Sequence, residues 1–109
     1  MTNKSPKSPC FPMYPSDFFG DPKVRLLDGI ERGLYVILLM SMWEYSDTPY
    51  LPNDDKKIAK LLQISEKKWK TFKISIFNCL EVTDEKITSP RLLREKEKQI
   101  KFREKQAIS

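Results

Sequence analysis

The sequence predicts a mainly α-helical domain with one small β-hairpin. Three segments with helical spacing of apolar residues each follow a residue that commonly caps a helix, and a short alternating segment around a polar turn comes after them. The chain has 109 residues, of which 39% are hydrophobic and 32% charged. This length suits one core rather than two, so we expect a single domain.

The start of the chain predicts an extended arm. Residues 1–12 hold three prolines among Ser, Lys and Asn, and such a composition does not repay the entropy of ordering. The aromatic stretch over residues 11–19 contains Pro12 and Pro15, so we expect it to lie extended across the core with its rings packed. The expected organisation is an arm over residues 1–12, a domain over residues 13–90 and a basic tail helix over residues 91–109.

The first helix is expected over residues 28–43 and at the centre of the domain. Asp28 as N-cap and Glu31 three residues later form a capping-box pair, and the segment after them is apolar nearly all round. Gly33 inside this helix costs about 1 kcal/mol relative to Ala. That cost predicts that a backbone or a ring passes close to Gly33. Residues 46–49 end the helix.

The second helix is expected to begin at Asn53 as N-cap, with Asp54 and Asp55 in its first turn, where the helix dipole favours acids. This capping role is favoured over a metal or acid–base role for the two carboxylates, because no third ligand accompanies them. The buried side would be Ile58, Leu61 and Leu62, and the solvated side Lys56, Lys57 and Lys60.

The third helix is expected to begin at Ser65 as N-cap, after a short connection over residues 63–64. Trp69, Phe72 and Ile76 recur with helical spacing and should face the core. The outward face and its margins would then carry Lys67, Lys68, Lys70, Thr71, Lys73, Ile74, Ser75 and Asn78.

A hairpin and a tail helix complete the chain. Residues 80–82 and 86–88 alternate around the polar turn 83–85, which is typical of a hairpin. Ser89 as N-cap and Pro90 begin a polar helix that reaches about residue 106. Three helices followed by a hairpin, with the third helix basic and exposed, have the order of a helix-turn-helix with a wing, the winged-helix fold.

Charge is distributed unevenly along the chain. Residues 16–55 hold three basic and eight acidic residues, a net −5, whereas residues 56–73 hold seven lysines and one Glu, a net +6. Residues 91–105 hold seven basic and three acidic residues, a net +4. The basic segments favour a polyanionic partner, although solvated lysines on helix faces are an equally weighted alternative for any one cluster.

Missing residue types argue against several classes of function. The chain has no His, so neither a Ser-His-Asp relay nor an imidazole metal site is expected, and Cys10 and Cys79 are too few for a thiolate cluster or a disulfide framework. We expect no enzyme, cofactor, metal or small-molecule substrate. The longest apolar run is shorter than the ~20 residues that span a bilayer, so a cytoplasmic protein without a membrane partner is expected.

Several residues resemble the YdaU-like family of phage and prophage proteins over roughly residues 12–100. The resemblance rests on residues 13–18 (MYPSDF), Glu31, residues 33–35, residues 38–39, Trp43, residues 51–54, residues 58–59, Trp69, Phe77 and residues 91–92. It implies a winged-helix-like module at the N-terminus of proteins acting in the initiation of phage DNA replication. The hairpin departs from the family, because residues 83–87 hold neither the Gly nor the aromatic residue usual there. Its acidic tip, Asp84 and Glu85, is poorly suited to phosphate contact.

The leading hypothesis is a DNA-binding domain, with double-stranded DNA favoured and the third helix in the major groove. The residues expected at DNA are Lys56, Lys57, Lys60, Lys67, Lys68, Lys70, Thr71, Lys73 and Asn78. The alternative is a protein-interaction module that binds a second copy or phage or host replication proteins. Its expected contacts are Ile74 on the third helix and Leu93 and Ile100 on the tail helix.

Overall fold

A computed structural model describes residue 11, residues 13–45 and residues 48–108, with side chains described up to residue 105. The elements follow one another as α1 (Pro15–Gly20), α2 (Pro22–Arg25), α3 (Gly29–Tyr45), β1 (Leu51–Pro52), α4 (Asp55–Leu62), α5 (Glu66–Ile76), the 3₁₀-helix η1 (Phe77–Cys79), β2 (Glu81–Val82), β3 (Lys86–Thr88) and α6 (Pro90–Ile108). The expected mainly helical fold with a small antiparallel sheet is confirmed.

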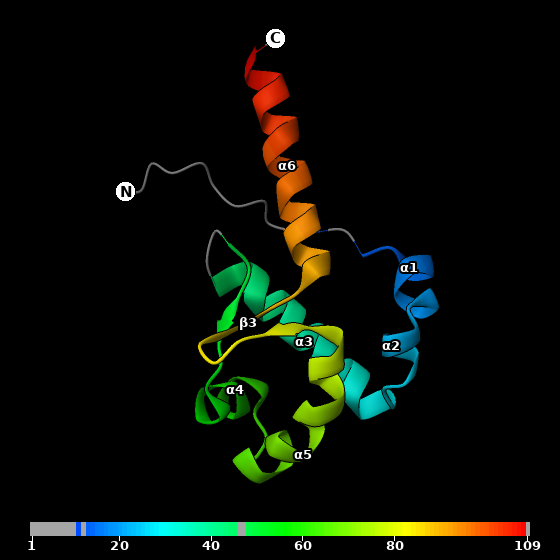
Figure 1. Cartoon of the computed structure of the whole chain (residues 1–109), viewed down its shortest axis with the longest axis vertical. Coiled ribbons are helices and arrows are strands. Elements are labelled where there is room, and N and C mark those ends of the chain that lie inside the picture. The colour runs from blue at the N-terminus through cyan, green and yellow to red at the C-terminus, as the bar shows by residue number, and fades with distance from the viewer. Residues whose placement is uncertain (1–10, 12, 46–47, 109) are drawn as a thin grey trace.

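The core is built around α3. Leu38, Leu39 and Met42 of this helix are fully buried, and Trp69 and Ile76 of α5 are buried in the same cluster. The helices α4 and α5 and the strand β1 all contact α3 (Figure 1). The expectation that the first long helix is central is therefore confirmed.

Three helix starts are as expected. The N–H of Glu31 donates to Asp28 Oδ1 at 2.8 Å and the N–H of Asp28 donates to Glu31 Oε1 at 2.9 Å, which completes the capping box of α3. Ser65 caps α5 through the N–H of Lys68 at 3.1 Å. Ser89, which is fully buried, caps α6 in the same way.

The sheet has one strand more than the hairpin that the sequence predicts. Its order is β1-β3-β2, both pairs are antiparallel, and Ile87 of β3 lies between Leu51 of β1 and Val82 of β2. Leu51 and Ile87 are both buried, so the added strand closes the core at the end of α3. A two-residue strand with a proline carries no alternating pattern by which the sequence could reveal it.

Three expectations for α3 and α4 are wrong. The N-cap of α4 is Asp54 rather than Asn53, because the Asp54 carboxylate accepts the first free N–H groups of the helix. Leu61 is exposed and Ala59 is buried in its place, since the side of α4 that meets the core runs through Ile58, Ala59 and Leu62. A Cβ atom at Gly33 would meet nothing within 4 Å, so no neighbour explains this glycine.

The aromatic stretch near the start is helical from Pro15 onward rather than extended, whereas Tyr14 before it is extended. Pro15 and Pro22 each stand in the first turn of a short helix, α1 and α2, where a proline costs no hydrogen bond. The expected ring packing holds for Phe18, which is buried, and for Phe11, whose ring lies 5.2 Å from that of Trp43. The rest of the arm expected over residues 1–12 lies outside the described residues.

The helix α6 begins on the body and projects from it (Figure 1). Its first turns are packed, with Leu92 fully buried and Arg91 Nη2 placed 3.2 Å from Asp21 Oδ2. The Arg91 guanidinium also lies 5.8 Å from the centre of the Phe18 ring. From Ile100 to Lys105 the side chains are exposed, so the basic tail helix is attached to the body through its first part.

We expect Asp54→Ala to lower the free energy of unfolding by about 1 kcal/mol, because the carboxylate accepts from the N–H groups of Lys56 at 3.0 Å and Lys57 at 3.2 Å. Asp84→Ala removes an exposed acid at the hairpin tip and should change that free energy by less than about 0.5 kcal/mol. Urea denaturation followed by circular dichroism measures both. Equal losses in the two variants would contradict the assignment of the cap.

Candidate nucleic-acid interface

The helices α4 and α5 are joined by a tight turn. Gln63 ends α4 with φ 60°, in the left-handed region, and its N–H reaches the carbonyls of Ala59 and Lys60. Ser65 then caps α5 two residues later. This connection leaves little freedom in where α5 begins, and the two helices pack directly on each other.

The carboxylate of Asp55 fixes α5 against α4. Its Oδ1 accepts a hydrogen bond from the indole Nε1 of Trp69 at 2.9 Å, and Lys73 Nζ lies 3.0 Å from both of its oxygens. Trp69 is fully buried, and Lys73 comes one turn later on α5. A single side chain in the first turn of α4 therefore holds two successive turns of α5.

The charge of Asp55 is stabilised where it stands. Its partial burial would by itself raise the pKa of the carboxyl, but the hydrogen bonds from Lys73 and Trp69 and the charge of Lys73 outweigh that effect. The pKa of Asp55 is consequently lowered from its ordinary value. Asp55 is ionised at neutral pH and balances Lys73.

The outer face of α5 carries a set of exposed side chains, as expected. Trp69 and Ile76 point into the core, and the opposite face presents Lys67, Lys68, Lys70, Thr71 and Ile74. Lys70 Nζ lies 3.3 Å from Glu66 Oε2 in an exposed i,i+4 pair, which contributes little and exchanges easily with another anion. The Thr71 hydroxyl donates to the carbonyl of Lys67 at 3.2 Å.

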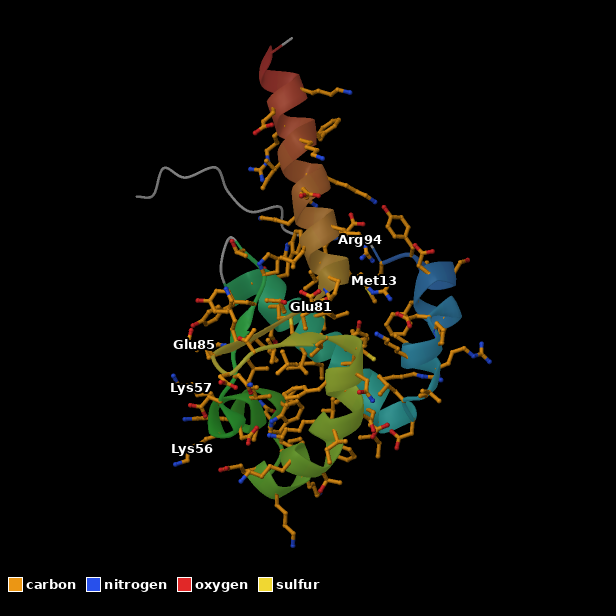
Figure 2. All side chains as sticks on the ribbon, viewed as in Figure 1. Met13, Lys56, Lys57, Glu81, Glu85 and Arg94 are labelled. Carbon is orange, nitrogen blue, oxygen red and sulfur yellow. The ribbon has the colours of Figure 1, made fainter. Side chains whose placement is uncertain are left out.

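The lysines of α4 extend this basic surface. Lys56, Lys57 and Lys60 are exposed, and none of them forms an ion pair within the part of the chain that the structure describes. Figure 2 shows Lys56 and Lys57 pointing outward from α4, on the side of the molecule where Glu85 lies. We call the exposed lysines 56, 57, 60, 67, 68 and 70 the lysine face.

Two residues expected at this surface are placed differently. Lys73 is half-buried, paired with Asp55 and 5.7 Å from the centre of the Phe77 ring. Its charge is therefore neutralised within the domain. Asn78 is exposed but lies in η1, beyond the end of α5 at Ile76. It does not continue the outer face of that helix.

The hairpin tip is anchored beside the start of α4. Asn53 Nδ2 donates to the carbonyl of Thr83 at 2.7 Å, and the Asn53 N–H donates to the carbonyl of Glu85 at 3.0 Å. The exposed acid Glu85 is thereby held on the side of the molecule that carries Lys56 and Lys57, and exposed Asp84 lies between the two anchored residues. The sequence does not reveal this role of Asn53, because an Asn before a helix is typical of a cap.

Another cation missed from the sequence stands on β3. Lys86 is exposed, with Nζ 5.2 Å from the centre of the Tyr50 ring. It adjoins the acidic tip and adds the only basic side chain of the hairpin strands, β2 and β3. Alternation in the strand could have indicated that Lys86 faces solvent, since Ile87 next to it is buried.

The three residues expected to bind a protein partner are not brought together. Ile74 is 71% exposed on α5. Ile100 is exposed and Leu93 is half-buried on α6, which Figure 1 shows at the opposite end of the molecule from α5. A single partner surface that joins these three side chains is therefore not formed by one copy of the chain.

The described residues include a polar hollow and a partly buried cysteine outside the lysine face. A polar hollow of about 410 Å³ lies between α1 and α6, but acids and bases alternate in its lining, with Asp17, Asp21 and Glu95 beside Arg91 and Lys98. Burial raises the pKa of the Cys79 thiol, which keeps it protonated at neutral pH. Among the described residues, no group of three or more His, Cys, Asp or Glu residues could hold a metal ion, and no helix is long and apolar enough to cross a membrane.

Comparison of the chain with protein-family models, with curated proteins and with solved structures gives no match. The proposed interface therefore rests on the geometry of the described residues.

Asp55→Asn is expected to lower the free energy of unfolding at pH 7 by about 1–3 kcal/mol, because it weakens a charged hydrogen-bond network. Since the folded-state pKa is lowered, the stabilisation by the ionised acid is complete above the unfolded-state pKa of about 3.9 and is lost as the pH falls through the folded-state value. The difference between the variant and the wild type should thus shrink below about pH 4.

Urea denaturation at a series of pH values, followed by tryptophan fluorescence, measures this difference. Asp17→Asn, at an exposed position of α1, serves as the control and should leave the stability at pH 7 near that of the wild type. A difference between Asp55→Asn and the wild type that stays constant down to pH 3 would rule out the ionised Asp55 as the link between α4 and α5.

Proposed function

We propose that the chain is a DNA-binding winged-helix domain that inserts α5 into the major groove of double-stranded DNA. The order α3-β1-α4-α5-β2-β3, with a sheet in the order β1-β3-β2, supports this fold assignment. In it, α4 and α5 are the helix-turn-helix and the β2–β3 hairpin is the wing. The chain then acts by binding and needs no reacting group.

The lysine face is the observation that carries the proposal. It spans both helices of the helix-turn-helix, and among the described residues its members form one ion pair, the exposed pair of Lys70 with Glu66. Lysines of α4 would hold flanking phosphates, and Lys67, Lys68 and Lys70 would reach phosphates or base edges from α5. Asp55 supports this arrangement by fixing the face of α5 that points outward.

The biological setting proposed is a phage, prophage or mobile-element protein in the initiation of DNA replication or its regulation. It rests on the resemblance of residues 13–18 and of the stretch around Gly33 to the YdaU-like family. The protein would work in the cytoplasm, where its DNA partner lies.

DNA binding is tested by fluorescence anisotropy with a generic duplex and with a single strand across a salt series. If four to six lysines neutralise phosphates, log affinity should fall with log salt at a slope of roughly −4 to −5. Lys67→Glu/Lys68→Glu should reduce duplex affinity by more than about tenfold and the slope by about 2. A slope of log affinity against log salt near zero for the wild type would contradict the proposal.

The choice of these two substitutions separates binding from folding. Lys68→Glu places an acid three residues after the Ser65 cap, in the first turn of α5, where it completes a capping box and should stabilise the helix. Lys98→Glu/Lys101→Glu, in exposed positions of α6, makes the same change in net charge away from the lysine face and should keep most of the affinity. Equal losses in both double variants would indicate a general charge effect and contradict a site on α5.

Lys73 and Lys60 form a matched pair for a further test. Lys73→Gln should lower the free energy of unfolding and leave the salt slope unchanged, because Lys73 is bound to Asp55. Lys60→Gln, on the exposed side of α4, should leave the free energy of unfolding unchanged and reduce the salt slope by about 1. Denaturation and anisotropy on each variant give the two readouts, and a reduced slope in Lys73→Gln would return that residue to the interface.

The second candidate is a protein-interaction module, favoured by the exposure of Ile74 amid the lysines of α5. Ile74→Ser separates the two candidates, since it should leave the affinity for DNA within about threefold if phosphates dominate binding. A folded wild type that binds neither duplex nor single strand at low salt would favour the interaction module.

A further inference from the structure

The helix α3 has two apolar faces, and only one of them is in the core. Tyr35, Leu38 and Met42 are buried against the rest of the domain. The opposite face carries a row of exposed apolar residues. These are Ile30 at 63% exposure, Ile37 at 40% and Met40 at 48%, with exposed Gly33 between them.

The spacing makes these residues a continuous stripe. Positions 30, 33, 37 and 40 of α3 follow one another in steps of three, four and three, which keeps them on one side of the helix. No charged residue occurs at these positions. Scattered exposed apolar side chains are ordinary, but a contiguous row along three turns of a helix marks an interaction surface. We call it the α3 stripe.

We infer that the α3 stripe binds the same stripe of a second copy, with the two α3 helices antiparallel. The stripe is complementary to itself when read in the opposite direction. A two-fold axis level with residue 35 sets Ile37 against the partner's Gly33, and Ile30 against the partner's Met40. At the centre, the large side chain of Ile37 lies opposite Gly33, which has none. At each end, the flexible Met40 lies opposite Ile30.

Gly33 provides the space that this pairing needs. A Cβ atom there would meet nothing within 4 Å in the single copy, so no contact among the described residues requires a glycine at this position. A glycine inside a helix lowers the stability of that helix. Against a second α3, the missing side chain admits Ile37 of the other helix. The antiparallel direction also brings opposite ends of the two helix dipoles together.

The α3 stripe and the lysine face lie on different sides of the molecule. The core side of α5 packs on the core side of α3, so the outer face of α5 and the stripe point away from each other. The inference is thus independent of the proposed DNA binding. A dimer formed through α3 directs its two lysine faces outward, away from the interface.

One helix per copy is a small interface. Stable dimers bury about 1,200–2,000 Å² in total, and a stripe of three side chains falls short of that on its own, so we expect a Kd on the order of 10–100 μM. Sedimentation velocity from about 10 μM to about 1 mM should show the mass rising from 12.9 kDa towards twice that value. A wild type that remains at 12.9 kDa at 1 mM would leave the stripe to a different protein and overturn the inference.

Ile37→Glu and Leu61→Glu are matched variants for this experiment. Both replace a side chain that is 40% exposed on a helix, Ile37 in the α3 stripe and Leu61 on α4. Ile37→Glu should weaken association more than about tenfold, and Leu61→Glu should leave it unchanged. Dimers that survive Ile37→Glu and are lost in Leu93→Glu/Ile100→Glu would assign the interface to α6 and contradict the inference.

The antiparallel arrangement is tested by exchanging the small and large residues. Gly33→Ile should weaken association more than about tenfold by filling the gap, while raising the helix propensity of α3. Gly33→Ile/Ile37→Gly restores a large residue opposite a small one and should recover most of the affinity. A double variant that stays monomeric while circular dichroism shows it folded would rule out this pairing.

Discussion

The contact on which the proposed site depends is the carboxylate of Asp55 between α4 and α5. It accepts from the buried indole of Trp69 and pairs with Lys73, so it ties the start of one helix to two turns of the other. A buried tryptophan N–H and a half-buried ammonium would each be costly without a partner, and one acid satisfies both. The result is an α5 that can rotate in neither direction without breaking a charged contact. The lysines of its outer face then have a defined direction, which a flexible helix of the same composition would lack.

The outward direction of these lysines matters because the acidic residues lie mostly on other parts of the domain. Five of the eight acids of residues 16–55 lie in or directly before α1, α2 and α3, whereas α4 and α5 carry the lysine face. Some of the acids are engaged in the structure, as Asp21 is with Arg91 and Asp55 with Lys73. A polyanion near the domain would be attracted to α4 and α5 and repelled by the surface of α1 to α3. The net charge of +5 conceals this difference, and the distribution of charge matters more than its sum.

What the sequence predicted well is local. Capping at Asp28, Ser65 and Ser89 depends on hydrogen bonds within three residues, and each was expected correctly. The features that it did not predict depend on residues that are far apart in the sequence. β1 exists because Leu51 pairs with Ile87, and Asn53 leaves the cap of α4 to Asp54 because its amide holds the hairpin at Thr83. Lys73 looked like any other lysine of its helix, since the sequence gives no sign that Asp55, in the first turn of α4, lies beside it. Pro15 favoured an extended chain, yet it begins α1.

The hairpin bears on how the proposed domain would approach DNA. Asn53 holds the tip at the start of α4 through the carbonyls of Thr83 and Glu85, so Asp84 and Glu85 stay beside that end of the helix. Two acids close to the flanking lysines reduce the attraction of this corner for phosphate, and Lys86 offsets them only in part. The positive potential of the lysine face is consequently strongest over α5, where Lys67 and Lys68 have no acid paired with them among the described residues. DNA contact in this domain would therefore centre on the helix, with the wing as a support that positions α4 rather than as a second phosphate clamp.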